Sequence, residues 1–415
     1  MTTPFRVPAL SRRSVLAATA LTPAASLCAA VDAGGVFPSG LFRGDDRIRV
    51  GIIGCGGRGT GAAIQAACAD RGVRVVALAD LFADQIASSS GVLEGAIGQQ
   101  FECPNERRFV GAAAHRDLLA CDVDVVILAA PPATRPAHLA AAVNRGVHMW
   151  CETPAAIDDA GLEVATAALA EARQRSLIVA SALCSRWDAP TMETIRRIHD
   201  GAIGRVLSVA VHHDGGLPWW KPAAPGTPAG EIRQRNWIGC AALSGGHFVE
   251  HHIHALDRAL WVLGDDKPVS AAKDRAGFLP VGGDFVRFAF DSGRTLEASC
   301  RRSESPGRGT AEVVVGTHGS ADLLAGVLDG PRASKAPKRQ PGQGGEMYQL
   351  AMAALLRDVR LGGNRLAGEG FPGGLSGDSG QALLRASALG VMGRMALEGR
   401  PQSEPGRGRQ TPRPA

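Results

Sequence analysis

A glycine-rich turn between a predicted strand and a predicted helix constrains the fold more than any other stretch of this 415-residue chain. The apolar run 48–53 leads into G-C-G-G-R-G at residues 54–59, and an alanine-rich helical segment follows. A second apolar run, 73–79, ends at Asp80, which lies 21 residues beyond Gly59. The turn alone is a weak signal among 53 glycines, but a strand, a helix and an acid at these spacings predict a dinucleotide-binding unit.

Each position in this turn has a physical role. Gly54 permits the tight turn, Gly56 lets the backbone approach a pyrophosphate, and Gly59 lets the helix pack against the strand. The helix N-terminus offers N–H groups and a partial positive charge to phosphate. Asp80 can accept hydrogen bonds from ribose hydroxyls and would repel a 2′-phosphate, so the sequence predicts NAD rather than NADP. The predicted cofactor site therefore includes Gly54, Gly56, Gly57, Arg58, Gly59 and Asp80.

The alternation of strands and helices continues beyond this unit. Apolar runs over 124–130, 147–150 and 176–180 are typical of buried strands, and 135–145 has a helical pattern. Strands that alternate with helices predict a doubly wound parallel sheet with ligands at the carboxyl ends of its strands. We therefore predict an NAD-binding domain over 46–182. Its cleft is expected to include Pro131, His138, Glu152 and Thr153.

The pattern changes near residue 201, which indicates a second domain over 183–400. Strand-like runs follow one another through turns, at 206–212, 284–290, 295–301 and 311–315. This order predicts an α+β domain with a large open, mostly antiparallel sheet. The uncovered edges of such a sheet favour packing against a second copy, so we expect a homo-oligomer.

A histidine-rich segment, SGGHFVEHHIHALD at 244–257, lies inside the second domain. If one helix spans 246–262, then His247, Glu250, His251 and His254 lie on one face.

Three interpretations of this segment follow. His254 can act as a general base supported by Glu250, His247 and His251 can bind a metal, or the polar face can be inert. The preceding dinucleotide domain and the paired glycines before the helix favour proton transfer, so we assign no metal. The nine cysteines contain no C-x-x-C pair and add no zinc motif.

The ends of the chain differ from its interior. The formal net charge of +5 lies in residues 1–30, which carry +3, and in 401–415, which carry +2 and are predicted to form a disordered tail. A basic excess confined to the ends gives no support for nucleic acid binding. Arg12 and Arg13 precede a short apolar stretch, which predicts a twin-arginine signal over 1–33 that the Tat export machinery would recognise. We therefore expect a periplasmic protein without a stable membrane span.

The chain resembles the Gfo/Idh/MocA oxidoreductases over roughly residues 47–400. The similar motifs are GIIGCGGRGTG, Asp80, the C-E-x-P block at 151–154 and the G-G-x-x-x-E-x-x-x-H pattern that ends at His254. The resemblance implies an N-terminal Rossmann domain, a C-terminal domain with a large open sheet, and NAD(P)-dependent chemistry on sugars, inositols or related polyols. It further implies that His254 is the acid/base at the substrate carbinol. Glu250 matches a position that is usually aspartate.

The resemblance also implies a substrate site in the second domain. Arg186 falls where the family often has a substrate-binding arginine, and we add His251 and Trp237, whose indole could stack on a sugar ring.

One departure from the family concerns its E-K-P motif, whose lysine contacts cofactor and substrate. This chain has Glu152-Thr153-Pro154 there, and it has no lysine before Lys221. Thr153 can hydrogen-bond a hydroxyl, but it cannot supply a cation.

Three functions are consistent with these features. The first is an exported NAD-dependent oxidoreductase that acts on a sugar, polyol or glycoside. The second is a redox-neutral glycoside hydrolase or lyase with non-exchanging NAD, because some NAD-dependent glycosidases of this fold also replace the lysine with an uncharged residue. The third is a non-catalytic sugar-binding or scaffold protein.

Overall fold

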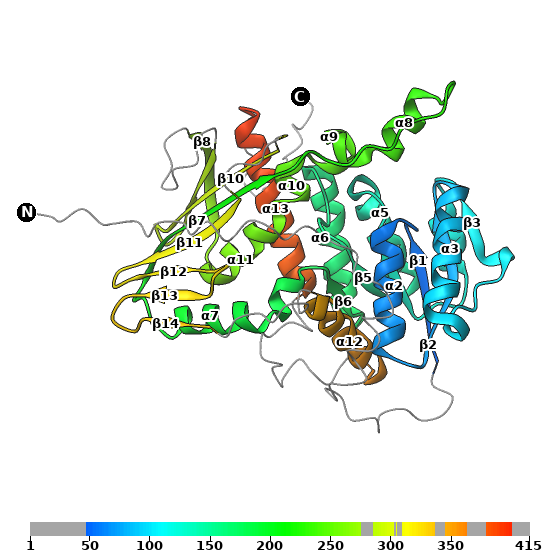
Figure 1. The fold of residues 1–415 in the computed structure, drawn as a ribbon, viewed down its shortest axis with the longest axis horizontal. Coiled ribbons are helices and arrows are strands. Elements are labelled where there is room, and N and C mark those ends of the chain that lie inside the picture. The colour runs from blue at the N-terminus through cyan, green and yellow to red at the C-terminus, as the bar shows by residue number, and fades with distance from the viewer. Residues whose placement is uncertain are drawn as a thin grey trace, which may run out of the picture.

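The computed structural model describes residues 47–274, 285–302, 304, 309–336, 345–362 and 379–400. The predicted signal 1–33 and tail 401–415 lie outside these residues. Two sheets stand at opposite ends of the molecule, with helices packed between and around them (Figure 1). None of the helices in this described part is long and apolar enough to cross a membrane.

The first sheet has six strands, all parallel, in the order β3-β2-β1-β4-β5-β6. The strands are β1 (Ile48–Ile53), β2 (Val73–Asp80), β3 (Arg108–Val110), β4 (Val125–Leu128), β5 (His148–Cys151) and β6 (Val179–Ser181). The helices around them include α2 (Gly57–Ala69), α3 (Ala83–Ile97), α4 (Ala114–Ala120), α5 (Arg135–Arg145) and α6 (Asp159–Gln174). Strand order reverses between β1 and β4, so the predicted doubly wound sheet is confirmed and its switch point lies beside the glycine turn.

The second sheet has eight strands in the order β14-β13-β12-β11-β7-β10-β9-β8. They are β7 (Val206–Gly215), β8 (Pro268–Asp274), β9 (Phe285–Phe290), β10 (Thr295–Arg302), β11 (Thr310–Gly316), β12 (Ser320–Asp322), β13 (Val327–Asp329) and β14 (Ser334–Lys335). All neighbours are antiparallel except β7 and β10. One face packs on α7 (Ala189–His199), α11 (Ile253–Leu263) and α13 (Ser379–Leu397). The predicted, mostly antiparallel sheet is therefore confirmed.

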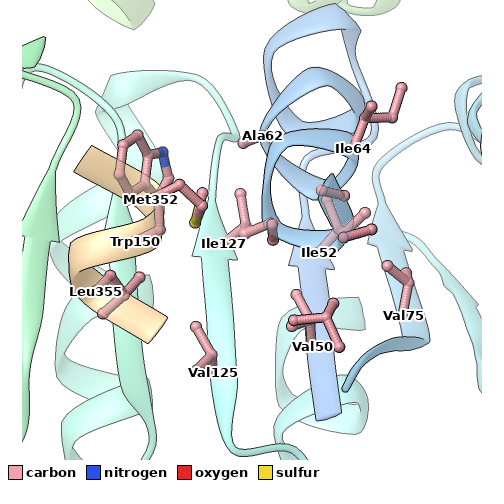
Figure 2. Packing of buried hydrophobic residues seen from close by; sticks show 14 of the residues in the cluster. Val50, Ile52, Ala62, Ile64, Val75, Val125, Ile127, Trp150, Met352 and Leu355 are labelled. Carbon is pink, nitrogen blue, oxygen red and sulfur yellow. The ribbon is translucent and has the colours of Figure 1, made fainter. Parts of the chain in front are cut away.

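The two domains are not consecutive segments of the chain. Helix α12 (Glu346–Arg360) packs on α2, and its Met352 and Leu355 join the core of the first sheet beside Trp150 and Ile127 (Figure 2). Our assignment of the whole range 183–400 to the second domain was therefore wrong for α12. The apolar face of this helix gives no sign of which sheet it covers, so its sequence does not identify its partner.

Residues 216–244 form an arm that extends from the end of β7 across the first domain (Figure 1). The arm contains α8 (Ala229–Arg235) and α9 (Ala241–Ser244). Arg235 pairs with Asp84 at 2.9 Å, and its guanidinium carbon lies 3.9 Å from the centre of the Phe82 ring. The arm thus contacts the loop that follows Asp80, at the adenosine end of the predicted cofactor site.

Candidate functional site

The glycine turn has the shape that a dinucleotide requires. Gly54 has φ +98°, and a Cβ there would lie 2.3 Å from the backbone nitrogen of Ala130. A Cβ on Gly59 would lie 2.0 Å from the carbonyl oxygen of Gly54. Positions 56 and 57, by contrast, face open space, and the N-terminus of α2 has no side-chain cap. Two glycines therefore build the turn, and two leave a backbone cradle for phosphate.

Asp80 is held at the end of β2 by the backbone of this turn. Its carboxylate accepts hydrogen bonds from the N–H of Cys55 at 2.7 Å and from the N–H of Phe82 at 2.9 Å. Burial raises the pKa of Asp80, and these two hydrogen bonds oppose that shift. Each carboxylate oxygen retains a lone pair for a ribose hydroxyl. The turn and Asp80 together fit NAD.

The E-T-P block follows β5, where our predictions placed it. The Glu152 side chain is nearly buried, and one of its oxygens accepts from Arg58 at 2.8 Å and from the Trp150 indole at 3.1 Å. Thr153 is half-buried, and its hydroxyl makes no hydrogen bond to another described residue. The Thr153 hydroxyl can thus hydrogen-bond a ligand, whereas the Glu152 carboxylate already accepts from Arg58 and Trp150.

Our sequence analysis missed Arg135, at the start of α5. It is only 3% exposed, and its guanidinium donates 2.6 Å hydrogen bonds to the carbonyl oxygens of Pro154 and Ala130. Burial lowers the pKa of Arg135. The side chain ties the loop after β4 to the loop after β5, so it fixes the position of Pro131 and Thr153. In the sequence, a basic residue beside a proline-rich turn was the feature that could have indicated this role of Arg135.

Two predicted site residues have structural contacts. His138 is 7% exposed and packs against His115, with ring centres 4.5 Å apart, so this contact gives no support to its predicted role in cofactor binding, which stays a prediction. Arg186 makes a bidentate ion pair with the fully buried Asp257, at 2.7–3.0 Å, and its guanidinium lies over Trp261. Its Nε and Nη2 are used in this ion pair, so Arg186 has a structural role, and its predicted substrate contact stays a prediction. Sequence spacing could not show that Arg186 pairs with a buried carboxylate.

The histidine-rich segment is not one helix. It forms α10 (His247–Glu250) and α11, separated by a turn at residues 251 and 252. Gly246, with φ +80°, precedes α10. The prediction of one continuous helix over 246–262 was therefore wrong, although ligand atoms of His247, Glu250 and His251 still lie within 4.8 Å of one another.

Glu250 faces Arg302 of β10 rather than His254. Its carboxylate lies 3.4 Å from the Arg302 guanidinium, and the structure gives it no hydrogen bond to His254 among the described residues. Burial raises the pKa of Glu250, while Arg302 and Arg135 lower it. The predicted support of His254 by Glu250 therefore has no direct contact behind it.

His254 is half-buried, and no described residue hydrogen-bonds its ring. Burial lowers its pKa to about 3, and the next causes are Arg258, His251, Arg58 and His213. One of these causes, the charge of Arg58, comes from the glycine turn of the first domain. A neutral imidazole that no described residue hydrogen-bonds can accept or donate a proton.

His247, Glu250 and His251 can bring their ligand atoms within 4.8 Å of one another, as a metal site would require. Arg302 opposes this use, because its Nε donates to His247 Nδ1 at 2.8 Å. A neutral ring that accepts at Nδ1 carries its hydrogen on Nε2, so it offers no free lone pair to a metal. The guanidinium also places a positive charge beside the Glu250 carboxylate. The H-x-x-E-H spacing therefore produces an Arg-His-Glu network.

His251 lies beside this network, and Trp237 lies on the arm. His251 is exposed, and its ring stacks on that of His247 and contacts the His213 ring at a tilt of 44°. Trp237 meets Trp219 edge to face, with ring centres 6.4 Å apart. Their role in binding a substrate stays a prediction.

Two family models match the chain. The model described as an oxidoreductase family with an NAD-binding Rossmann fold matches residues 48–182, and the GFO/IDH/MocA C-terminal domain matches residues 192–322.

Curated relatives share part of this length. An inositol 2-dehydrogenase 4 of Saccharopolyspora erythraea is 30% identical over 40% of this chain and 45% of its own. A glycosyl hydrolase family 109 protein of Solibacter usitatus is 29% identical over 42% of this chain and 39% of its own. The chain thus spans about half the length of the curated relatives it matches.

Solved structures agree in fold over most of the chain. An aldose-aldose oxidoreductase of Caulobacter crescentus has a TM-score of 0.57 at 21% identity, covering 86% of this chain and 99% of its own. A myo-inositol 2-dehydrogenase of Lactobacillus plantarum has a TM-score of 0.59 at 17% identity, covering 86% and 98%. At these identities the likeness shows the fold alone.

Proposed function

The chain belongs to the GFO/IDH/MocA oxidoreductase family, and on that premise we propose that it is an NAD-dependent oxidoreductase of a sugar or polyol hydroxyl. One observation carries the proposal: the glycine turn is open at positions 56 and 57, and Asp80 is held beside it, as a dinucleotide requires. His254, whose ring no described residue hydrogen-bonds, supports it as a group that can exchange a proton. NAD bound in the turn supplies a hydride acceptor. The inositol dehydrogenase names of the relatives support a polyol substrate.

The residues of the proposed site have separate roles. The turn and Asp80 bind and orient the cofactor, and His254 exchanges a proton with the substrate hydroxyl. Because its pKa lies near 3, His254 is neutral at physiological pH and is a weak base in the resting protein. We therefore expect proton transfer to accompany hydride departure, when the hydroxyl becomes most acidic. Thr153 can orient that hydroxyl by a hydrogen bond.

Replacement of His254 tests the catalytic assignment. His254→Ala should lower kcat by about 10²–10⁴ because general acid–base catalysis contributes that much, while the NADH dissociation constant should stay unchanged. The exposed His318 offers a matched control, and His318→Ala should keep full turnover. Turnover of His254→Ala at the control rate would refute the assignment.

A redox-neutral glycosidase is the second candidate function. It is favoured by Thr153, which brings no cation to the reacting carbon, and by the partial match to a glycosyl hydrolase family 109 protein. Native mass spectrometry, followed by extraction of bound nucleotide, separates the candidates. NAD(H) that does not exchange with added cofactor indicates the redox-neutral cycle, and steady NADH release with a free sugar indicates the dehydrogenase. Absence of nucleotide affinity would contradict both and leave a non-catalytic sugar-binding protein.

We propose in addition that the protein is exported in folded form through the twin-arginine route. Arg12, Arg13 and the apolar stretch that follows support this localisation. Cell fractionation should find the protein in the periplasm, and Arg12→Lys/Arg13→Lys should retain it in the cytoplasm. Equal export of both proteins would reject the route.

A further inference from the structure

The arm over 216–244 touches the first domain at two places, on either side of the glycine turn. Helix α8 contacts the loop that follows β2, through Arg235. Helix α9 packs on the short helix Pro132–Thr134, which follows β4. Strands β2 and β4 are the neighbours of β1, and the glycine turn follows β1. The arm therefore joins the ends of the two strands that flank the cofactor site.

Arg235 makes the contact at the end of β2 with both faces and edges of its guanidinium. Its Nη1 and Nη2 atoms donate to the two carboxylate oxygens of Asp84 at 2.9 and 3.1 Å, and its Nε donates to Glu231 of α8 at 2.8 Å. Its guanidinium carbon lies 3.9 Å from the centre of the Phe82 ring. A bidentate ion pair and an aromatic face together fix the plane of a guanidinium. Arg235 is thus oriented by residues of both domains.

The loop that Arg235 holds is hydrogen-bonded to the glycine turn. Phe82 donates its backbone N–H to Asp80 at 2.9 Å, and Asp80 also accepts from the N–H of Cys55 at 2.7 Å. Asp84 follows in the first turn of α3. Residues 80–84 and the turn therefore form one connected unit, and Arg235 binds the side of this unit that faces the arm.

The arm is braced beside this contact. Asn236 is only 3% exposed, and its side chain accepts from the N–H of Lys221 at 2.7 Å and donates to the carbonyl oxygens of Lys221 and Ile232 at 3.0 Å. These hydrogen bonds tie the stretch that enters the arm to α8. The edge-to-face contact of Trp219 with Trp237 joins the same two stretches. A movement of Arg235 is therefore transmitted along the arm and is not absorbed by a loose loop.

We propose that the contact of Arg235 with Phe82 and Asp84 is a latch, which holds the arm across the cofactor site and limits the rate of NAD(H) exchange. This inference rests on the proposed function, because it takes NAD(H) to bind in the glycine turn. The Asp84 side chain is 58% exposed, so water screens the ion pair and the latch can open reversibly. All the contacts of the latch join protein groups. Opening it therefore costs the same for entry and for release, and the dissociation constant does not depend on it.

The rates of NADH binding and release test the latch without turnover. Stopped-flow fluorescence follows the binding of NADH, and displacement of bound NADH by excess NAD gives its release. Arg235→Gln removes the ion pair and weakens the contact with the Phe82 ring. Both rate constants should rise about three- to tenfold, as expected for the loss of one exposed ion pair and one exposed cation–π contact, with an unchanged dissociation constant. Arg235→Lys keeps the charge and should give intermediate rates.

Other variants separate the latch from a general effect on the arm. Asp84→Ala breaks the same ion pair from the first domain, so it should accelerate both rates even if Arg235→Gln does not fold. The double variant should be no faster than Arg235→Gln with respect to this ion pair, because the two residues act together. Arg233 is exposed on the same helix, and Arg233→Gln is the matched control with wild-type rates.

Hydrogen exchange gives a second readout, which needs no cofactor. The amides of residues 82–86 and 229–235 should exchange faster in Arg235→Gln than in Arg233→Gln. Equal NADH rates in these two variants would overturn the inference. Faster release with unchanged binding would also overturn it, because Arg235 would then be a direct ligand of the cofactor. Absence of NADH binding by the wild type would instead remove the proposed function, and the latch with it.

Discussion

The cofactor end and the proton-transfer end of this site are built in different ways. The cofactor end comes from one uninterrupted segment, β1 to β2, in which Gly54, Gly59 and Asp80 constrain one another through the backbone. The proton-transfer end is assembled from β5, α2, α11 and β10, which are distant in sequence. Sequence spacing specifies a site that is built from one segment. A site assembled from distant segments depends on ion pairs, which sequence spacing does not reveal.

The largest expected change in stability concerns the glycines of the cofactor end. Gly54→Ala should destabilise the protein by more than about 3 kcal/mol, because a strained backbone at positive φ is combined with a 2.3 Å contact to Ala130. Gly61→Ala, in helix α2 at a half-buried position where a Cβ would meet no atom within 4 Å, should stabilise it by about 0.5–1 kcal/mol. Urea unfolding measures both changes. Equal stabilities would mean that the turn is not locally constrained.

Arg186 provides the corresponding test at the assembled end. Arg186→Met should destabilise the protein by about 3–5 kcal/mol, because it leaves the carboxylate of Asp257 buried without a partner. The exposed Arg196 pairs with Glu193 and Asp200, and Arg196→Met should leave the stability nearly unchanged, because water screens both ion pairs. Urea unfolding and substrate KM are measured together. A large rise in KM with unchanged stability would instead support the substrate role that the resemblance predicts for Arg186.

Buried histidines at both ends should make the protein sensitive to acid. Burial lowers the folded-state pKa of His138, His247 and His254 to about 3, below the usual value of 6.5. The unfolded chain therefore binds more protons below pH 6.5, and stability should fall as the pH drops from 6.5 toward 3. Each histidine should contribute about 1.4 kcal/mol per pH unit in that window.

Urea unfolding at pH 7.5, 6 and 5 measures this slope. His138→Phe, which keeps a ring in the first domain, should flatten the slope by about one proton relative to the wild type. An unchanged slope would show that His138 titrates normally in the folded protein.

Asp80 should give the smallest effect. Asp80→Ala should weaken NAD binding about tenfold, or about 1.4 kcal/mol, and should leave NADP binding unchanged or stronger, because a repulsive charge is removed. Asp84→Ala, in the first turn of α3, loses an exposed ion pair with Arg235 and is the control. Isothermal titration with both cofactors provides the measurement. Equal losses for NAD and NADP would mean that Asp80 acts by holding the turn through Cys55 and Phe82.

The sequence predicted the elements whose periodicity matches a local rule. The parallel sheet, the glycine turn and the open second sheet were all correct. The continuous helix over 246–262 was wrong because the chain turns at residues 251 and 252. The structure gives no hydrogen bond between Glu250 and His254 among the described residues. The contacts of His138 with His115 and of Arg186 with Asp257 could not be predicted, because these partners are far away in the sequence.

By itself, the sequence determined the dinucleotide turn, its acid and the two-sheet architecture, because steric limits on glycine and the periods of strands and helices act over a few residues. Only the tertiary structure decided which charges meet. It paired Arg58 with Glu152, Arg302 with Glu250 and His247, and Arg186 with Asp257. It also placed α12 in the first domain. Coulomb interactions and burial depend on distances in space, and those distances follow from packing rather than from separation along the chain.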